Sequence, residues 1–168
     1  MAAAVQNLYA DNYGLPWSEA SASGIVVARP FIFDLANQTN PLLSATSTIK
    51  LMQLPGANLP GFTLLGFTFY VPDLDSSTNV VLQLGDNTTA DVFLTTTLMG
   101  TIGRVPGRVS SGGVGVSTVV GAPVIGSLPK TYTAANDLVL TIQAGPTTAT
   151  TGIIQGYAEY TQWPMTSF

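Results

Sequence analysis

The stretch "LGFTFYVPDLDSSTNVVLQLGDN" (residues 65–87) contains two apolar runs separated by a short acidic turn. Successive side chains of an extended strand point to opposite faces, so each run presents one continuous apolar face. The inward faces are expected to hold Leu65, Phe67, Phe69 and Val71 in a strand over 62–71, and Val80, Leu82 and Leu84 in a strand over 79–85. Two such strands joined by a turn predict an antiparallel sheet with one buried face.

The same period-2 pattern, interrupted by Gly and Pro, continues on both sides of this stretch. Further strands are expected over 24–35, 46–54, 91–99, 114–120, 137–143 and 153–163. In the first of them Phe31 and Phe33 share a face with Arg29, and Pro30 favours an edge position because it lacks an amide hydrogen. In the last, Ile154, Ala158 and Tyr160 are expected to face inward. About eight strands without a helix predict an all-β, jelly-roll-like antiparallel β-sandwich, with a closed barrel as the lesser alternative.

Two segments depart from the strand pattern. Residues 1–23 are interpreted as an extended N-terminal arm, and residues 24–168 as the sandwich domain with a long loop at 100–129. The arm carries large aromatic residues, which a solvated tail would not need, so we expect them to dock on this subunit or on another. The loop is rich in Gly, Val and Ile, which favours an ordered contact loop over disorder. The expected partner-binding residues are Tyr9, Tyr13, Trp17, Arg104 and Arg108.

Few residues of this chain are candidates for a catalytic role. The chain has no His and no Cys, which removes a Ser-His-Asp triad, thiolate chemistry and the commonest transition-metal ligands. Ser47 and Lys50 match an S-x-x-K spacing, but residues three apart in a strand point to opposite faces. Glu19 and Glu159 are the only glutamates, and Glu19 lies in the arm. We therefore expect no enzyme, no cofactor and no metal site.

Two acidic turns are the remaining candidates for a metal-binding site. Asp73 and Asp75 resemble the start of a calcium loop, but no Glu follows at the distance that such a loop needs. Asp and Ser after Pro are ordinary turn residues, so a hairpin turn is favoured over a divalent ion. In the second turn, Asp86 is expected to accept hydrogen bonds from loop amides.

Charge is sparse: charged residues make up 8% of the chain, against roughly 25% in ordinary soluble domains. With five basic and nine acidic residues, the chain is a poor candidate for binding nucleic acid, which needs clustered Lys and Arg. No apolar run approaches the roughly 20 residues of a bilayer-spanning helix, and no signal peptide is visible. No nucleic-acid or membrane partner is therefore expected.

Two longer stretches suggest a family. "LPGFTLLGFTFYVPDLDSSTNVVLQLGDNTTADVFL" (59–94) and "TYTAANDLVLTIQAGPTTATTGIIQGYAEYT" (131–161) resemble the capsid decoration, or cement, proteins of tailed bacteriophages. The shared features are strands and turns rather than catalytic groups. The arm and the 100–129 loop lie outside the resemblance.

The resemblance implies a structural virion protein on the outer capsid surface. Such a protein would act as a homotrimer that binds and cements neighbouring major capsid proteins, stabilising the shell by repeated contacts. The alternative is a virion-attached carbohydrate-binding or host-adhesion module, because exposed Tyr and Trp residues also suit sugar stacking.

Overall fold

The structure, a computed structural model, describes residues 7–11, 13, 26–38, 44–54, 62–71, 80–99, 107–111, 128–145 and 152–162. Within these ranges the chain forms ten strands and one 3-10 helix of three residues. They are β1 (Asn7–Tyr9), β2 (Val27–Asp34), η1 (Leu35–Asn37), β3 (Thr48–Leu54), β4 (Phe62–Val71), β5 (Val80–Asp86), β6 (Leu94–Met99), β7 (Gly107–Ser111), β8 (Lys130–Tyr132), β9 (Asn136–Ala144) and β10 (Ile153–Gln162).

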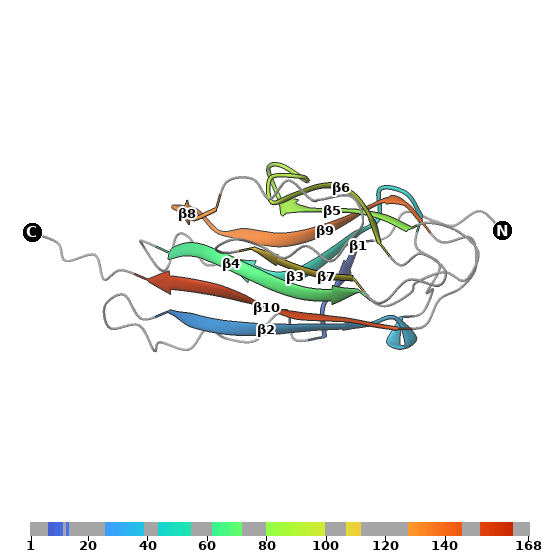
Figure 1. The fold of residues 1–168 in the computed structure, drawn as a ribbon, viewed down its shortest axis with the longest axis horizontal. Coiled ribbons are helices and arrows are strands. Elements are labelled where there is room, and N and C mark those ends of the chain that lie inside the picture. Colours follow the sequence, from blue (N-terminus) through green and yellow to red (C-terminus); the bar gives the residue numbers. More distant parts are fainter. Residues whose placement is uncertain are drawn as a thin grey trace, which may run out of the picture.

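The strands form two stacked sheets, so the predicted β-sandwich is confirmed (Figure 1). The first sheet has the order β1-β3-β9-β5-β6, and the second has the order β2-β10-β4-β7, with β8 also paired to β4. All pairings are antiparallel except that of β1 with β3. If β1 and β8 are set aside, the strand orders of the two sheets are β3-β9-β5-β6 and β2-β10-β4-β7. These orders are compatible with the jelly-roll-like arrangement expected from the sequence.

The core lies between the two sheets and is built from the inward positions of both. Its largest fully buried side chains are Phe31, Phe33, Phe62, Phe67, Phe93, Leu35, Ile49, Leu51, Met52 and Leu54. The inward positions predicted for β2, β5 and β10 are confirmed at Phe31, Phe33, Leu82, Leu84, Ile154, Ala158 and Tyr160. The edge position expected from Pro30 is also confirmed, because β2 is the last strand of its sheet.

The inward face predicted for β4 is wrong at Leu65. Glu159 of β10 pairs with Gly66, and the next residue, Tyr160, pairs with Leu64, so the register skips Leu65. An extra residue of this kind is a β-bulge, and it reverses the facing of the side chains on one side of it. As a result Leu64 and Phe67 are both buried, and Leu65 is only half-buried.

Other elements differ from the prediction at their ends or were missed. β6 begins at Leu94 rather than at residue 91, because Asp91, Val92 and the buried Phe93 belong to the turn before it. Strand β7 lies inside the segment predicted as a loop, whereas the strand predicted over 114–120 falls outside the described residues. The arm supplies β1, Lys130–Tyr132 form the unpredicted strand β8, and η1 follows β2 directly. The described residues therefore contain ten strands instead of about eight.

Candidate partner-binding site

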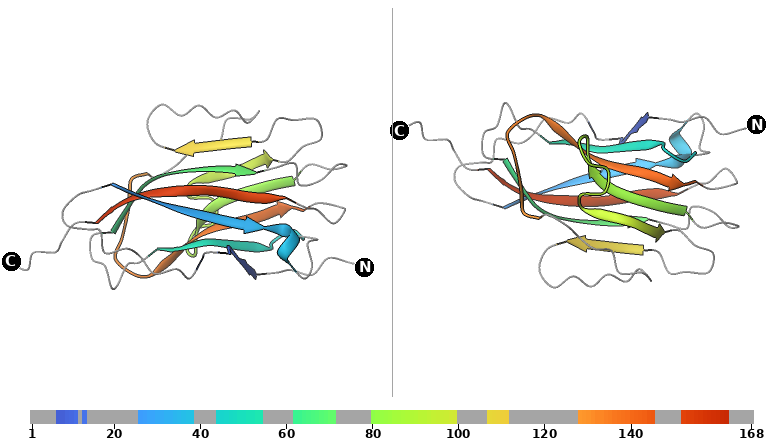
Figure 2. Two further views of the ribbon diagram at one scale, coloured as in Figure 1. Left: turned by 90° about the horizontal axis from the view of Figure 1, so that it is seen from below. Right: turned by 90° about the horizontal axis from the view of Figure 1, so that it is seen from above.

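The residues predicted to bind a partner do not form one cluster. Tyr9 ends β1, Tyr13 follows it closely, and Arg108 lies on β7, where it pairs with Tyr70 of β4. β1 and β7 lie at opposite sides of the sandwich, as both views of Figure 2 show. Trp17 and Arg104 fall outside the described residues, as do Asp73 and Asp75.

Tyr9 and Tyr13 lie together against Lys50 of β3. Their ring centroids are 5.0 Å apart in an edge-to-face arrangement. The Lys50 ammonium lies 5.8 Å from the centroid of the Tyr9 ring, within range of a cation–π interaction. Tyr9 still has 51% of its surface exposed, whereas Tyr13 is half-buried. Of the two, Tyr9 therefore offers the larger surface to a partner.

Asp137 of β9 holds Tyr13 and Lys50 in place through hydrogen bonds. Its Oδ1 accepts a hydrogen bond from the Tyr13 hydroxyl at 2.5 Å. Its Oδ2 accepts from Lys50 Nζ at 2.7 Å and from Asn87 Nδ2 at 2.9 Å. Burial alone would raise the pKa of Asp137, but these donors and the Lys50 charge outweigh it and hold that pKa below its ordinary value. The carboxylate therefore stays ionised in the fold.

The pKa values of the two groups that contact Asp137 change accordingly. The hydrogen bond to Asp137 is the main cause that raises the pKa of Lys50, against the opposing effect of burial. Burial and the carboxylate together raise the pKa of the Tyr13 hydroxyl. Both groups thus keep their protons far above neutral pH.

Residues 7–11 and 13, which we call the arm bridge, connect the two sheets along one side of the sandwich. Ala10 N donates to the Lys50 carbonyl on β3 at 2.8 Å, and the next amide, Asp11 N, donates to the Ile32 carbonyl on β2 at 2.7 Å. Asn7 Oδ1 also accepts from Thr48 Oγ1 at 2.7 Å. The sequence left open whether the arm aromatics dock on this subunit, and the arm bridge shows that Tyr9 and Tyr13 do.

A second buried carboxylate, Asp86, closes the loop after β5. Its Oδ1 accepts from the amides of Thr88 and Thr89, both at 2.9 Å, which confirms the predicted amide contacts. Its Oδ2 accepts from Lys130 Nζ at 2.6 Å and from the Tyr132 hydroxyl at 3.0 Å. Burial opposes ionisation here too, but the four donors hold the pKa of Asp86 below its ordinary value.

Both carboxylates are suited to holding loops in place rather than to catalysis. Each is ionised and occupied by a lysine and other donors, so neither is poised to exchange a proton near neutral pH. In the part of the chain that the structure describes, no group of three or more His, Cys, Asp or Glu side chains could hold a metal ion. The same ranges contain no helix long and apolar enough to cross a membrane.

The two anchors could not be identified from the sequence. Lys50 and Asp137 are 87 positions apart, and Lys130 and Asp86 are 44 apart. The available signal was an acidic residue inside an apolar strand run, as in "NDLVLTI", because a buried charge requires a partner. That signal marks Asp137, but only the pairing of β3 with β9, which places Lys50 opposite Val139, brings the lysine within reach of it.

Comparison with known proteins gives a likeness of fold. No known family and no curated protein matches the sequence. A chain in the structure "Cyanophage Pam1 capsid asymmetric unit" superposes with a TM-score of 0.53 at 13% identity, covering 90% of this chain and 99% of that one. A chain in the structure "Capsid of Ralstonia phage GP4" superposes with a TM-score of 0.54 at 19% identity, covering 93% and 97%. At these identities the comparison shows a shared fold.

Proposed function

We propose that this chain is a structural protein of a phage virion that binds the outer surface of the capsid and cements neighbouring major capsid proteins. The observation that carries the proposal is the fold shared with chains of two phage capsids. Each superposition covers nearly all of both chains, so the similar chains are about the size of this one.

The composition supports the same function. A chain without His or Cys and with 8% charged residues has few side chains of the types that enzymes use for catalysis. The same composition suits broad apolar contacts with other proteins. In the proposed arrangement three copies form a homotrimer on the shell. Many weak contacts repeated over a capsid stabilise it by mass action, without any single tight site.

Tyr9 is the described residue that we expect to contact the shell. Its ring is half exposed and is held in place by Tyr13 and Lys50, so a partner would not need to order it. Tyr is also enriched among the residues that contribute most to protein interfaces. The proposal extends to Trp17, Arg104 and Arg108 from the sequence alone.

The test is binding to capsids that the phage carrying this chain assembles without it. We expect saturable co-sedimentation of the purified chain, and regular density for it on the shell in a reconstruction of the virion. Tyr9→Ala should raise the dissociation constant by about tenfold or more at unchanged thermal stability. Exposed Ala45, replaced by Ser, serves as the control variant.

Two outcomes would overturn the proposed function. One is a virion reconstruction that places the chain at the tail or finds none of it on the shell. The other is a glycan array with strong and specific binding, combined with no binding to capsids, which would favour the carbohydrate-binding alternative.

A further inference from the structure

Strand β1 is the last strand of the first sheet, beside β3 at the margin of the sandwich (Figure 2). Ala10 N donates to the Lys50 carbonyl on β3, so the backbone groups of Ala10 and of Leu8, two residues before it, face β3. The backbone groups of Asn7 and Tyr9 therefore face away from β3. Among the described residues, β3 is the only strand that pairs with β1. Within that part of the chain the outer edge of β1 is open.

An open edge of this kind binds an extended backbone. The N–H and C=O groups of Asn7 and Tyr9 have the spacing of a β-ladder, so a strand added beside β1 could pair with all of them. The edge is already ordered for this contact. Asn7 Oδ1 accepts from Thr48 Oγ1 at 2.7 Å, and the Tyr9 ring lies beside Tyr13 and the Lys50 ammonium. Binding would therefore cost little additional ordering of β1.

The open edge of β1 is complementary to itself. If β1 of a second copy lies antiparallel beside it, the alignment that uses every open group places Leu8 opposite Leu8 of the second copy and Asn7 opposite Tyr9. Each Asn7–Tyr9 pair then exchanges both of its N–H···O bonds, and the pair of Leu8 residues lies between them. Because both copies use the same surface, the contact is isologous and has two-fold symmetry.

The side chains of β1 suit this pairing. On the outward face, Asn7 of one copy lies next to Tyr9 of the other, which is 51% exposed. The Asn7 amide Nδ2 donates to none of the described residues, so it is available to this neighbour. No like charges meet at the contact, because β1 contains no charged residue and Lys50 beside it is paired with Asp137. An edge that is neutral and matches itself in length favours a second copy as its occupant.

We propose that β1 pairs with β1 of a second copy of this chain in an antiparallel arrangement, which joins the first sheets of the two copies into one continuous sheet. This contact goes beyond the proposed function and does not depend on it, because it forms between copies of this chain alone. A two-fold contact joins copies in pairs, so on the shell it would link neighbouring homotrimers. The pairing uses the backbone of Tyr9 and leaves its ring on the outward face.

The first test is sedimentation velocity of the full-length chain over a series of concentrations, for which we expect a monomer–dimer equilibrium. Tyr9→Pro removes the N–H that faces the second copy and keeps the bonds between β1 and β3. It should raise the dissociation constant by about tenfold or more. Tyr9→Ala removes the same ring but keeps the N–H, so it should raise the dissociation constant less.

Ala45→Pro is the control for an added proline. Ala45 is exposed at the second position of the turn that the bond from Ser47 N to the Ser44 carbonyl closes, a position that proline favours. This variant should leave association unchanged.

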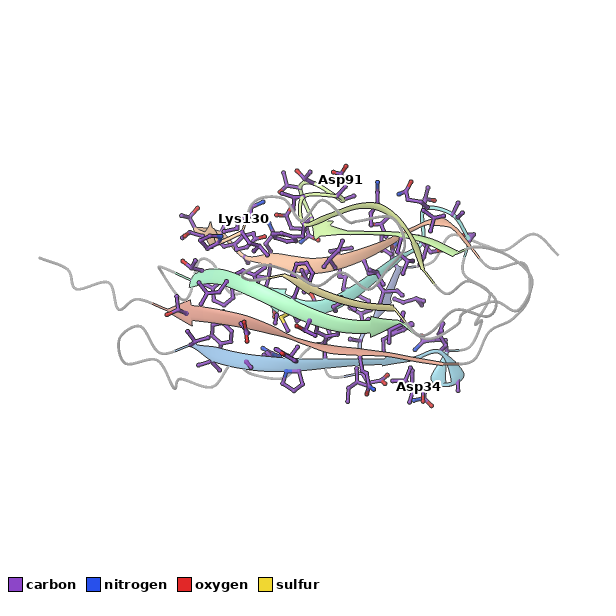
Figure 3. All side chains as sticks on the ribbon, in the orientation of Figure 1. Asp34, Asp91 and Lys130 are labelled. Carbon is purple, nitrogen blue, oxygen red and sulfur yellow. The ribbon has the colours of Figure 1, made fainter. Side chains whose placement is uncertain are left out.

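Cysteine cross-linking tests the register directly, because the chain has no Cys of its own. In the proposed pair the Cα atoms of Leu8 in the two copies would be about 4.5 Å apart, which suits a disulfide. Leu8→Cys should therefore give a covalent dimer under mild oxidation. Asp91→Cys is the control for random collision, since Asp91 is exposed in the loop between β5 and β6, at the edge of the first sheet away from β1 (Figure 3). It should cross-link about tenfold more slowly or not at all.

A wild type that stays monomeric, with no covalent dimer of Leu8→Cys, would overturn the proposal. The same holds for a dimer that Tyr9→Pro weakens no more than Tyr9→Ala, because the copies would then associate through another surface. Capsids take no part in these measurements. Pairing of β1 in a chain that does not bind capsids would overturn only the proposed function, and capsid binding without this pairing would overturn only the β1 contact.

Discussion

At Gly85 the backbone of a neighbouring loop leaves no room for a side chain. A Cβ atom there would lie 2.0 Å from the Thr89 carbonyl oxygen and 2.4 Å from the Ala90 carbonyl carbon. Both are backbone atoms, fixed by the hydrogen bond from Asp86 N to the Thr89 carbonyl. The loop that holds Asp86 in place therefore depends on this glycine.

Gly85→Ala should lower the free energy of unfolding by about 2–3 kcal/mol, since the loop must move to admit the methyl group. Urea denaturation measures the change. Thr88→Ala in the same loop is the control, because Thr88 contacts Asp86 through its backbone amide, which the variant keeps. Equal stability of Gly85→Ala and Thr88→Ala would contradict the tight packing at Gly85.

Thr46 occupies a backbone conformation that suits a β-branched residue poorly. Its φ is 70°, in the left-handed region, and its side chain is exposed in the turn before β3. Asn tolerates this region better than Thr, and the bond from the residue 46 amide to the Ile142 carbonyl would remain. Thr46→Asn should therefore raise the free energy of unfolding by about 0.5–1 kcal/mol.

The midpoint of chemical denaturation checks this prediction, with Ala45→Asn as the neighbouring control at an exposed position of the same turn. If Thr46→Asn were no more stable than the wild type, the left-handed conformation would carry no measurable strain.

At the scale of elements, the arm bridge depends on Asp137. Replacing this carboxylate by an amide removes the charge that pairs with Lys50 and places two hydrogens where three donors converge. Asp137→Asn should lower the free energy of unfolding by about 1–3 kcal/mol, which is less than the roughly 3–5 kcal/mol of a fully buried broken pair because Lys50 is partly exposed. It should also loosen the arm bridge before the sandwich unfolds.

Hydrogen exchange at the amides of Ala10 and Asp11 measures that loosening directly, because both donate to carbonyls of the sandwich. Tyr13→Phe, which removes one hydroxyl, should give a smaller effect of about 1 kcal/mol. Asp91→Asn changes an exposed acid and should have no effect. Unchanged exchange in Asp137→Asn would mean that the backbone contacts alone hold the arm bridge.

The strands could be predicted where a single face is buried without interruption. The pattern located β2, β5 and β10, where inward and outward residues mostly alternate. It located β9 as a continuous apolar run, and six consecutive residues of that strand are buried. It failed at Leu65, where the bulge depends on pairing with β10, a strand nearly a hundred residues away. It also missed β1, β7 and β8, which have three, five and three residues and are too short to carry a full alternation of their own.

The candidate site was also predictable only in part, because local sequence patterns do not show which distant strands pair. Aromatic residues in an otherwise irregular arm predicted docking, and in the described part of the arm Tyr9 and Tyr13 do lie against β3 and β9. The position of docking depends on Lys50 and Asp137, which only the pairing of β3 with β9 brings together. The contributions of Trp17 and Arg104 stay predictions from the sequence.

For the whole molecule, most of the few basic residues are used within the subunit. Two of the five basic residues form ion pairs with buried carboxylates, and a third is buried in the second sheet. Charged residues make up only 8% of the chain, so few ionisable side chains are left outside these contacts. It also means that stability should respond to pH through a small set of identified groups.

The dependence of stability on pH should be a broad plateau with a loss at each end. The chain has no His or Cys, so no side chain with an ordinary pKa near neutrality titrates. The pKa values of Asp86 and Asp137 are lowered by folding, so their contribution is present above the unfolded value of about 3.9 and is lost as the pH falls through the folded values. The pKa values of Tyr13, Tyr132 and Lys50 are raised, so their contribution is present below about pH 10 and is lost above it.

Thermal denaturation at a series of pH values tests this dependence on the whole chain. Between about pH 5 and pH 9 the melting temperature should change little, and it should fall on the acid side of about pH 4. Asp137→Asn should lie below the wild type across the plateau, and the two curves should converge in acid, where the wild-type carboxylate is also neutral. A step in melting temperature near neutral pH would contradict this account, because the sequence contains no side chain that titrates there unless its pKa is strongly shifted.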